Sequence, residues 1–211
     1  MAQRGPDVHG ALRLPPRHAC RTQRPAMSAS NPDYAAAVTA FYLWLRQMHA
    51  GEPVHEPGME FGAPNAWWGQ RRLRPRPHEG LDLVGFRANA SEASILGMSL
   101  RPIEGGECVA VFQDFLCYTA IVRRQAPSEL LWCYAHLQLN PGVRPGMMLS
   151  TDDVLGWVPA DSDAERRSKC PPHLHLSLLH QQSGGLEWGS VDWRTIHDIP
   201  QLSFVPLALL Q

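Results

Sequence analysis

Two histidines one residue apart, His173 and His175, stand in the alternating apolar stretch CPPHLHLSL. In a β-strand, side chains at positions i and i+2 point to the same face of the sheet. The two imidazoles should therefore lie side by side with Ser177, while the three leucines of this stretch point to the opposite face. Buried imidazoles need hydrogen-bond partners or a metal ion, because leaving them unsatisfied costs free energy. A zinc ion would satisfy both rings.

Two further pieces of sequence offer side chains of the same kind. PHEGLDLVGF contains His78 and Asp82, which would be roughly 13 Å apart in a straight strand. Gly80 between them permits a bend that could bring the two side chains to one ion. LLWCYAHLQL contains His136, for which a core histidine bonded to a backbone carbonyl is the alternative interpretation. The alternation of this strand predicts that Tyr134 shares the face of His136, which makes it a candidate for contact with a substrate.

Composition indicates which elements must position these residues. The 211 residues carry a formal net charge of -1, so bulk electrostatics give no support to a nucleic-acid partner. The 19 prolines and 17 glycines beside 44% hydrophobic residues favour many short strands over long helices. We expect a mostly β protein with a compact antiparallel sheet and an N-terminal helix. Short strands are expected at residues 81–86, 94–100, 108–112, 117–122, 130–139, 154–158, 174–179 and 202–210.

The N-terminal part of the chain reads as two segments before the main domain. Residues 1–32 are rich in Arg and Pro without a hydrophobic period, which predicts a disordered tail. Residues 33–52 read as a helix with Asn31 or Asp33 at its cap and Gly51 at its end, with a signal peptide as the alternative. No apolar run reaches the roughly 20 residues of a transmembrane span. The main domain is expected at residues 53–211.

Aromatic and sulfur side chains leave two interpretations open. Trp67 and Trp68, in the basic stretch NAWWGQRRLRPRP, could line a substrate groove or serve as packing anchors. The five cysteines include no C-x-x-C pair, so they are interpreted as reduced core thiols rather than a disulfide framework or a cysteine zinc site. Cys170 is close enough to the histidine pair in sequence to be considered as a metal ligand or a redox-active thiol.

Taken together, the motifs resemble those of the lysostaphin-type (LytM-like) zinc endopeptidases, a family of peptidoglycan hydrolases. HEGLD matches the family's H-x-x-x-D, YAHL its Y-x-H-L, and PPHLHLSL its H-x-H, in the family's order. PGVRPGMMLSTDDVLGWV between them resembles the family's hairpin. The resemblance covers roughly the last two thirds of the chain, and the ordered set is more specific than any one motif.

The resemblance implies a role for each of these residues. His78, Asp82 and His175 would bind one zinc ion per chain, while His136 and His173 would act beside the water at the open fourth position. Three protein ligands and one exchangeable site are the catalytic arrangement of zinc. The implied activity is hydrolysis of peptide bonds in peptidoglycan stem peptides or cross-links. The family implies the bacterial cell envelope or periplasm, although the sequence has no clear signal peptide, and the oligomeric state is unknown.

Two other functions fit parts of the pattern. A non-enzymatic regulator or activator of cell-wall amidases could use the same domain, but such relatives usually lack metal ligands, whereas this chain keeps the full set. A non-haem iron oxygenase also uses two histidines and a carboxylate, but its usual H-x-D spacing is absent here. The sequence therefore favours the zinc endopeptidase.

Overall fold

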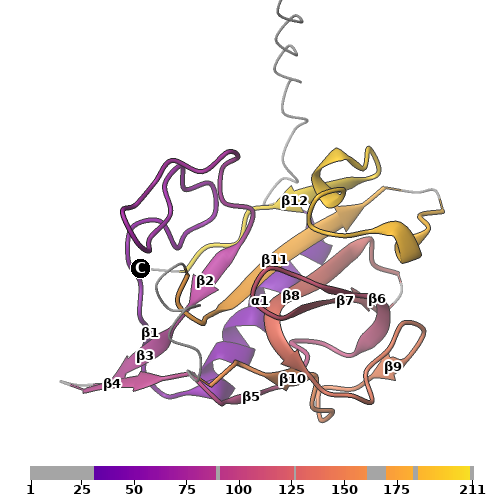
Figure 1. Ribbon diagram of the computed structural model, residues 1–211. Coiled ribbons are helices and arrows are strands. Elements are labelled where there is room, and N and C mark those ends of the chain that lie inside the picture. The colour runs from indigo at the N-terminus through magenta and orange to yellow at the C-terminus, as the bar shows by residue number, and fades with distance from the viewer. Residues whose placement is uncertain (1–30, 89–90, 126, 161–169, 183–184, 210–211) are drawn as a thin grey trace, which may run out of the picture.

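The fold is a mostly antiparallel β structure that carries one long helix within the described part of the chain (Figure 1). The computed structural model describes residues 31–88, 91–125, 127–160, 170–182 and 185–209. The predicted tail, apart from its last two residues, lies outside these ranges. The main sheet runs in the order β12-β11-β8-β7-β6-β9, and β2, β10 and β5 join it at its sides. A smaller sheet has the order β1-β3-β4.

The bounds of the elements agree with the predicted pattern of short strands. The main sheet is built from β2 (Leu81–Leu83), β5 (Ser99–Leu100), β6 (Gly106–Gln113), β7 (Tyr118–Arg124), β8 (Leu130–Leu139), β9 (Met148–Leu149), β10 (Gly156–Trp157), β11 (Leu174–Gln181) and β12 (Leu202–Val205). The smaller sheet is built from β1 (Glu52–Pro53), β3 (Gly85–Ala88) and β4 (Ser91–Ser94). Two 3-10 turns, Trp188–Ser190 and Ile196–Asp198, precede β12. The mostly β fold with an N-terminal helix is thus confirmed.

The helix α1 (Pro32–Met48) covers one face of the main sheet. Asn31 caps its N-terminus, and the side chain of Asn31 accepts hydrogen bonds from the backbone N–H groups of the first turn. The helix buries a stripe with helical spacing, formed by Ala37, Phe41, Trp44 and Leu45. The ring of Phe41 lies 6.3 Å from that of Trp132 in β8. The segment is therefore a packed helix, three residues shorter at its end than the Gly51 boundary predicted.

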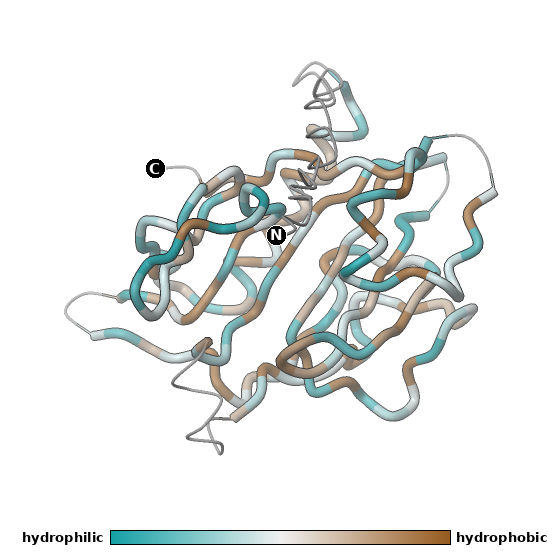
Figure 2. The backbone as a smooth tube through the Cα atoms, turned by 45° about the horizontal axis from the view of Figure 1, so that its top comes forward, coloured by the Kyte–Doolittle hydropathy of each residue, from teal (hydrophilic) through white to brown (hydrophobic). Residues whose placement is uncertain are grey.

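The two faces of the sheet bury different sets of side chains. Leu174, Leu176 and Leu178 of β11 belong to the core under α1. Leu179 of β11 and Leu131 of β8 belong to a second apolar cluster on the opposite face. Figure 2 shows the resulting contrast between brown strands that cross the fold and teal outer loops. The second face is the one toward which His175 and Ser177 point.

Two predicted strands are each interrupted. The expected strand at 81–86 divides into β2, which pairs with β11, and β3, which pairs with β4 in the smaller sheet. The expected strand at 94–100 divides into the end of β4 and the short β5. In both cases the chain passes from one sheet to the other. A single continuous strand could not form hydrogen bonds with the neighbouring strands of both sheets.

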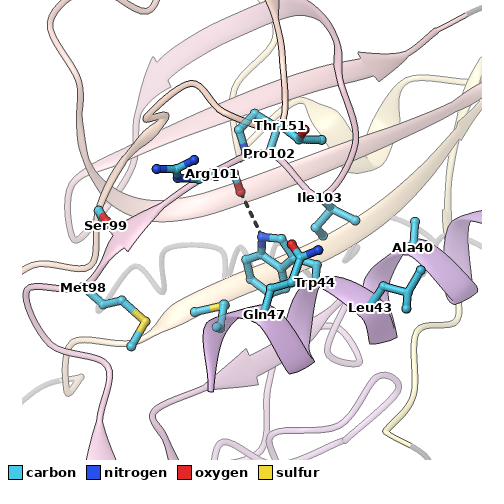
Figure 3. Close-up of a pocket in the computed structure, with 11 residues that line it drawn as sticks. Ala40, Leu43, Trp44, Gln47, Met98, Ser99, Arg101, Pro102, Ile103 and Thr151 are labelled. Atoms are coloured by element: carbon cyan, nitrogen blue, oxygen red, sulfur yellow. Dashed lines mark hydrogen bonds between the residues drawn. The ribbon is translucent and has the colours of Figure 1, made fainter. Parts of the chain in front are cut away.

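A hollow lies beside α1, and the described residues of its wall include none of the histidines of the candidate site. It lies between α1 and the segment around β5, and its wall includes Leu43, Trp44, Met98 and Pro102 (Figure 3). The indole Nε1 of Trp44 donates to the carbonyl of Arg101 at 3.0 Å. Among the described residues, no helix is long and apolar enough to cross a membrane.

Candidate metal centre

Three side chains from two neighbouring strands and the preceding loop converge at the edge of the main sheet. In the register of β2 and β11, Asp82 lies directly opposite His175. Oδ1 of Asp82 is 2.8 Å from Nδ1 of His175 and 3.2 Å from Nε2 of His78. Nε2 of His78 is 3.1 Å from Nδ1 of His175. These three side chains are buried, and together they could hold a metal ion.

The other ring nitrogens of the two histidines are bonded away from this centre. Nδ1 of His78 donates to the carbonyl of Glu60 at 2.9 Å, because a carbonyl oxygen can only accept. In the neutral ring, Nε2 of His78 must then carry a lone pair toward the centre. Nε2 of His175 is 2.8 Å from the hydroxyl of Ser177. Metal-ligating histidines are held in this way by a partner on the second nitrogen.

The separations of the three donor atoms fit a small tetrahedral ion. Nitrogen and oxygen ligands about 2.0–2.1 Å from such an ion lie about 3.3 Å from one another. The observed separations of 2.8, 3.1 and 3.2 Å are slightly shorter than this. Without a cation, the lone pair of His78 faces a carboxylate oxygen, which is unfavourable. The donor set therefore suits a metal ion.

His173 lies beside the carboxylate but is oriented differently. Its Nδ1 donates to the carbonyl of Pro171 at 2.7 Å, and its Nε2 is 3.4 Å from Oδ1 of Asp82. Burial alone would lower the pKa of His173, but the Asp82 charge outweighs it and raises the pKa to about 10. For Asp82 the directions are reversed. Burial alone would raise its pKa, but the charge of His173 and the hydrogen bonds of the histidines hold the pKa well below its usual range. A cation bound at Asp82 would weaken the stabilisation of the charged His173.

A β-bulge places His136 at the same centre. In the pairing of β7 with β8, Tyr118 lies opposite Leu137 and Ala120 lies opposite Tyr134. Between these pairs β7 has one residue and β8 has two, so β8 holds one extra residue. His136 has φ of 67°, in the left-handed region. Its ring lies 4.8 Å from that of His173 and 5.9 Å from that of His175. The bulge thus turns His136 toward the site although Leu137 remains in the core.

The same bulge removes Tyr134 from the site. The side chain of Tyr134 is fully buried in the core under α1, and its hydroxyl accepts a hydrogen bond from the backbone N–H of Ile103 at 2.7 Å. The prediction that Tyr134 shares the face of His136, and so contacts substrate, is therefore wrong. Regular alternation of side chains does not continue through the extra residue.

Asp114, in the turn between β6 and β7, supports His136. Oδ1 of Asp114 is 3.1 Å from Nδ1 of His136, which is an ion-pair distance but lacks the alignment of a hydrogen bond. Oδ2 of Asp114 accepts a hydrogen bond from the backbone N–H of His136 at 2.9 Å. Thr119 donates to Oδ2 at 2.8 Å, and the indole of Trp193 donates to the hydroxyl of Thr119 at 2.7 Å. Burial lowers the pKa of His136 to about 4, although Asp114 acts in the opposite direction. These contacts orient the ring of His136.

Aromatic side chains form the walls of the cleft above these residues. The cleft has a volume of about 150 Å³, and its walls include Trp68, Phe115, Trp193 and the ring of His197. Phe115 is 66% exposed and its ring centre lies 4.6 Å from that of His136. Trp68 thus lines the cleft, whereas Trp67 forms a hydrogen bond with Asp82. Its indole Nε1 donates to Oδ2 of Asp82 at 2.7 Å.

Several of these residues were not identified from the sequence. Asp114 and Trp193 have no motif around them. Asp114 reaches His136 from the turn between β6 and β7, and Trp193 reaches the site from the segment between the two 3-10 turns, with its ring centre 5.5 Å from that of His175. Arg74, with Nη2 3.6 Å from Oδ2 of Asp82, appeared in the sequence only as part of a basic stretch. Cys170 is buried with Sγ 4.0 Å from Nδ1 of His173, on the side of the ring away from Asp82. It is not among the three residues that converge.

Comparison with known proteins gives matches among solved structures. No family model matches the sequence, and no curated protein matches it. The chain is similar in structure to lysostaphin-type peptidases. The catalytic domain of the prophage-encoded M23 protein EnpA from Enterococcus faecalis has 16% identity and a TM-score of 0.36, over 65% of this chain and 90% of that one. LytU has 18% identity and a TM-score of 0.42, over 72% and 87%.

The antimicrobial peptidase lysostaphin from Staphylococcus simulans is a further match. It has 18% identity and a TM-score of 0.39, over 65% of this chain and 44% of that chain. At such identities and TM-scores, the functional proposal depends on the residues of the site itself.

The close approach of β2 to β11 leads to a first prediction, for Gly80. A Cβ at this position would lie 2.3 Å from the carbonyl oxygen of Leu176 and 2.7 Å from Nε2 of His175. Because backbone atoms cannot move aside cheaply, Gly80→Ala should destabilise the fold by about 1–3 kcal/mol and weaken metal binding. Urea unfolding and metal titration measure the two effects. Gly189→Ala, with no atom near its added Cβ, should change neither.

The hydrogen bonds of Asp114 predict a dependence of stability on pH. Burial would raise the pKa of Asp114, but His136 and the backbone donors lower it well below the usual pKa of about 3.9 for an exposed Asp. A lowered folded-state pKa stabilises the fold above the unfolded-state pKa, and this contribution is lost as the pH falls further. Asp114→Asn should therefore be less stable than the wild type at pH 7, and the difference should narrow below about pH 4. Urea unfolding of the chelator-treated proteins across this range checks it, and a constant difference would contradict it.

Proposed function

We propose that this protein is a zinc-dependent endopeptidase of the lysostaphin type that hydrolyses peptide bonds in peptidoglycan stem peptides or cross-links. The observation that carries the proposal is the convergence of Nε2 of His78, Oδ1 of Asp82 and Nδ1 of His175, with two more histidines beside them. The motifs that supply these residues are the ones that resemble the family. The corresponding location is the bacterial cell envelope, and the corresponding partner is a peptidoglycan peptide.

The donor set favours zinc over other metals. Two imidazole nitrogens and one carboxylate oxygen form a borderline-soft set, whereas magnesium and calcium prefer oxygen donors alone. Three protein ligands leave the fourth tetrahedral position open, as in catalytic zinc sites. When bound at such a site, zinc lowers the pKa of a coordinated water to about 7 and polarises a carbonyl group.

The residues of the chain would then supply proton transfer and orientation. Asp114 lies 3.1 Å from Nδ1 of His136, and a proton on Nδ1 leaves the lone pair on Nε2, while burial keeps the ring neutral. His136 is therefore assigned as the base that takes the proton of the attacking water. His173, anchored through Nδ1 to Pro171, presents Nε2 to the centre and is assigned as the donor to the developing oxyanion.

Release of free amino groups from purified peptidoglycan tests this function. The zinc-loaded protein should release them over time, and the chelator-treated protein should not until zinc is restored. No release from a folded protein that holds one zinc per chain would contradict the peptidoglycan endopeptidase and favour the regulator of amidases. Metal analysis of the purified protein separates zinc from iron.

A further inference from the structure

The two oxygens of the Asp82 carboxylate have separate sets of partners. Oδ1 is surrounded by histidine nitrogens, at 2.8 Å from His175, 3.2 Å from His78 and 3.4 Å from His173. Oδ2 accepts the indole N–H of Trp67 at 2.7 Å and lies 3.6 Å from Nη2 of Arg74. Oδ1 thus faces the metal ligands, while Oδ2 faces a loop that belongs to neither strand of the site.

This loop, residues 56–78, is held in shape by its own backbone. Asn65 and Leu73 form a β-bridge, and the backbone N–H of Arg74 donates to the carbonyl of Pro64 at 2.8 Å. It joins β1 to β2 and arches beside β2, in purple at the upper left of Figure 1. The indole of Trp67 is therefore presented to Asp82 by a folded segment.

The guanidinium of Arg74 is held by two contacts besides the one with Asp82. Nη2 donates to the carbonyl of Gly58 at 3.2 Å, and the group lies 4.8 Å from the centre of the Trp68 ring. Its side chain is only 15% exposed. The positive charge next to Oδ2 is thus kept in place by the same loop that carries Trp67.

We propose that Trp67 and Arg74 are positioning residues that make Asp82 bind the metal through Oδ1 alone. The inference rests on the proposed function, because it assumes a metal ion at His78, Asp82 and His175. A carboxylate with a free second oxygen can turn and bind a metal through both oxygens, which raises the coordination number. With Oδ2 held by an N–H donor and a nearby cation, this rotation is opposed. The fourth position then stays open to water.

A purely structural role for the Trp67 bond makes a different prediction. If the bond only anchored the loop, its loss would lower the stability of the protein and leave the geometry of the metal unchanged. If it sets the coordination of Asp82, its loss changes the metal's spectrum and affinity in the folded protein. Cobalt(II) reports this directly, because its visible absorption is intense in four-coordinate sites and weaker when the coordination number rises.

The experiment uses the full chain with Trp67→Phe, loaded with cobalt(II) or zinc. We expect weaker visible absorption of the cobalt protein and a loss of metal affinity of about 10–100-fold, measured by competition with a chromophoric chelator. Trp44→Phe is the matched control, because it also removes a partly buried indole N–H bond, which goes to the carbonyl of Arg101 and not to a residue of the metal site (Figure 3). The control should keep the wild-type spectrum and affinity.

The second variant, Arg74→Gln, removes the charge and keeps most of the side chain. It should reduce metal affinity less than Trp67→Phe, since its contact with Oδ2 is longer. If Trp67→Phe does not fold, an unchanged affinity and cobalt spectrum in Arg74→Gln overturns the inference. Wild-type spectra and affinities in a folded Trp67→Phe overturn it as well. A wild-type protein that binds neither metal overturns the proposed function instead.

Discussion

Asp82→Ala is expected to abolish metal binding and, with it, hydrolysis of peptidoglycan. The carboxylate is 1% exposed, and three histidines, Trp67 and Arg74 all point to it. Its removal deletes one of the three proposed protein ligands and the negative charge that would balance the ion. We expect zinc affinity to fall by more than about 100-fold, beyond the range typical of residues outside the ligand shell.

Chelator competition and amino-group release measure the two losses in the same preparations. Asp82→Asn is run in parallel because it retains the volume of the side chain and separates loss of charge from loss of packing. The control is Asp152→Asn, which removes a carboxylate from an exposed ion pair with Arg101. Retention of one tightly bound zinc by a folded Asp82→Ala protein would refute the proposed ligand set.

His136→Asn is expected to separate catalysis from metal binding. Asparagine tolerates the positive φ of this position, so the bulge in β8 should persist. The ring of His136 is assigned as the proton acceptor and not as a ligand, so one zinc per chain should remain bound. Loss of a general base costs about 10²–10⁴ in rate. The expected result is a drop of this size in kcat at unchanged zinc content.

The measurement combines zinc analysis with initial rates at several substrate concentrations. His180→Asn is the control, since His180 lies near the far end of β11 and pairs with Glu129. It should behave as the wild type. If His136→Asn loses its zinc, His136 is a ligand and the assignment of roles must change. An unaltered rate would exclude His136 as the base.

The sequence alone determined the fold class and which histidines and carboxylate converge in the candidate site. The alternation of His173, Leu174 and His175 predicted which side chains share a face, and the structure places the leucines in the core and both histidines next to Asp82. The bend expected at Gly80 also occurs. β2 begins directly after this glycine and pairs with β11. These features depend on neighbours in the chain, where period and glycine positions carry the information.

The tertiary structure alone decided what lies around these residues. Tyr134 and His136 are two residues apart in sequence, yet one is in the core and the other in the cleft, because β8 has a residue more than its partner strand at this point. Trp67 and Asp114 reach the site through a loop and a turn that no local pattern connects to it. Periodicity specifies a face for each residue only while the register is regular. Contacts between distant segments depend on which strands and loops pack together, and that is settled by the whole fold.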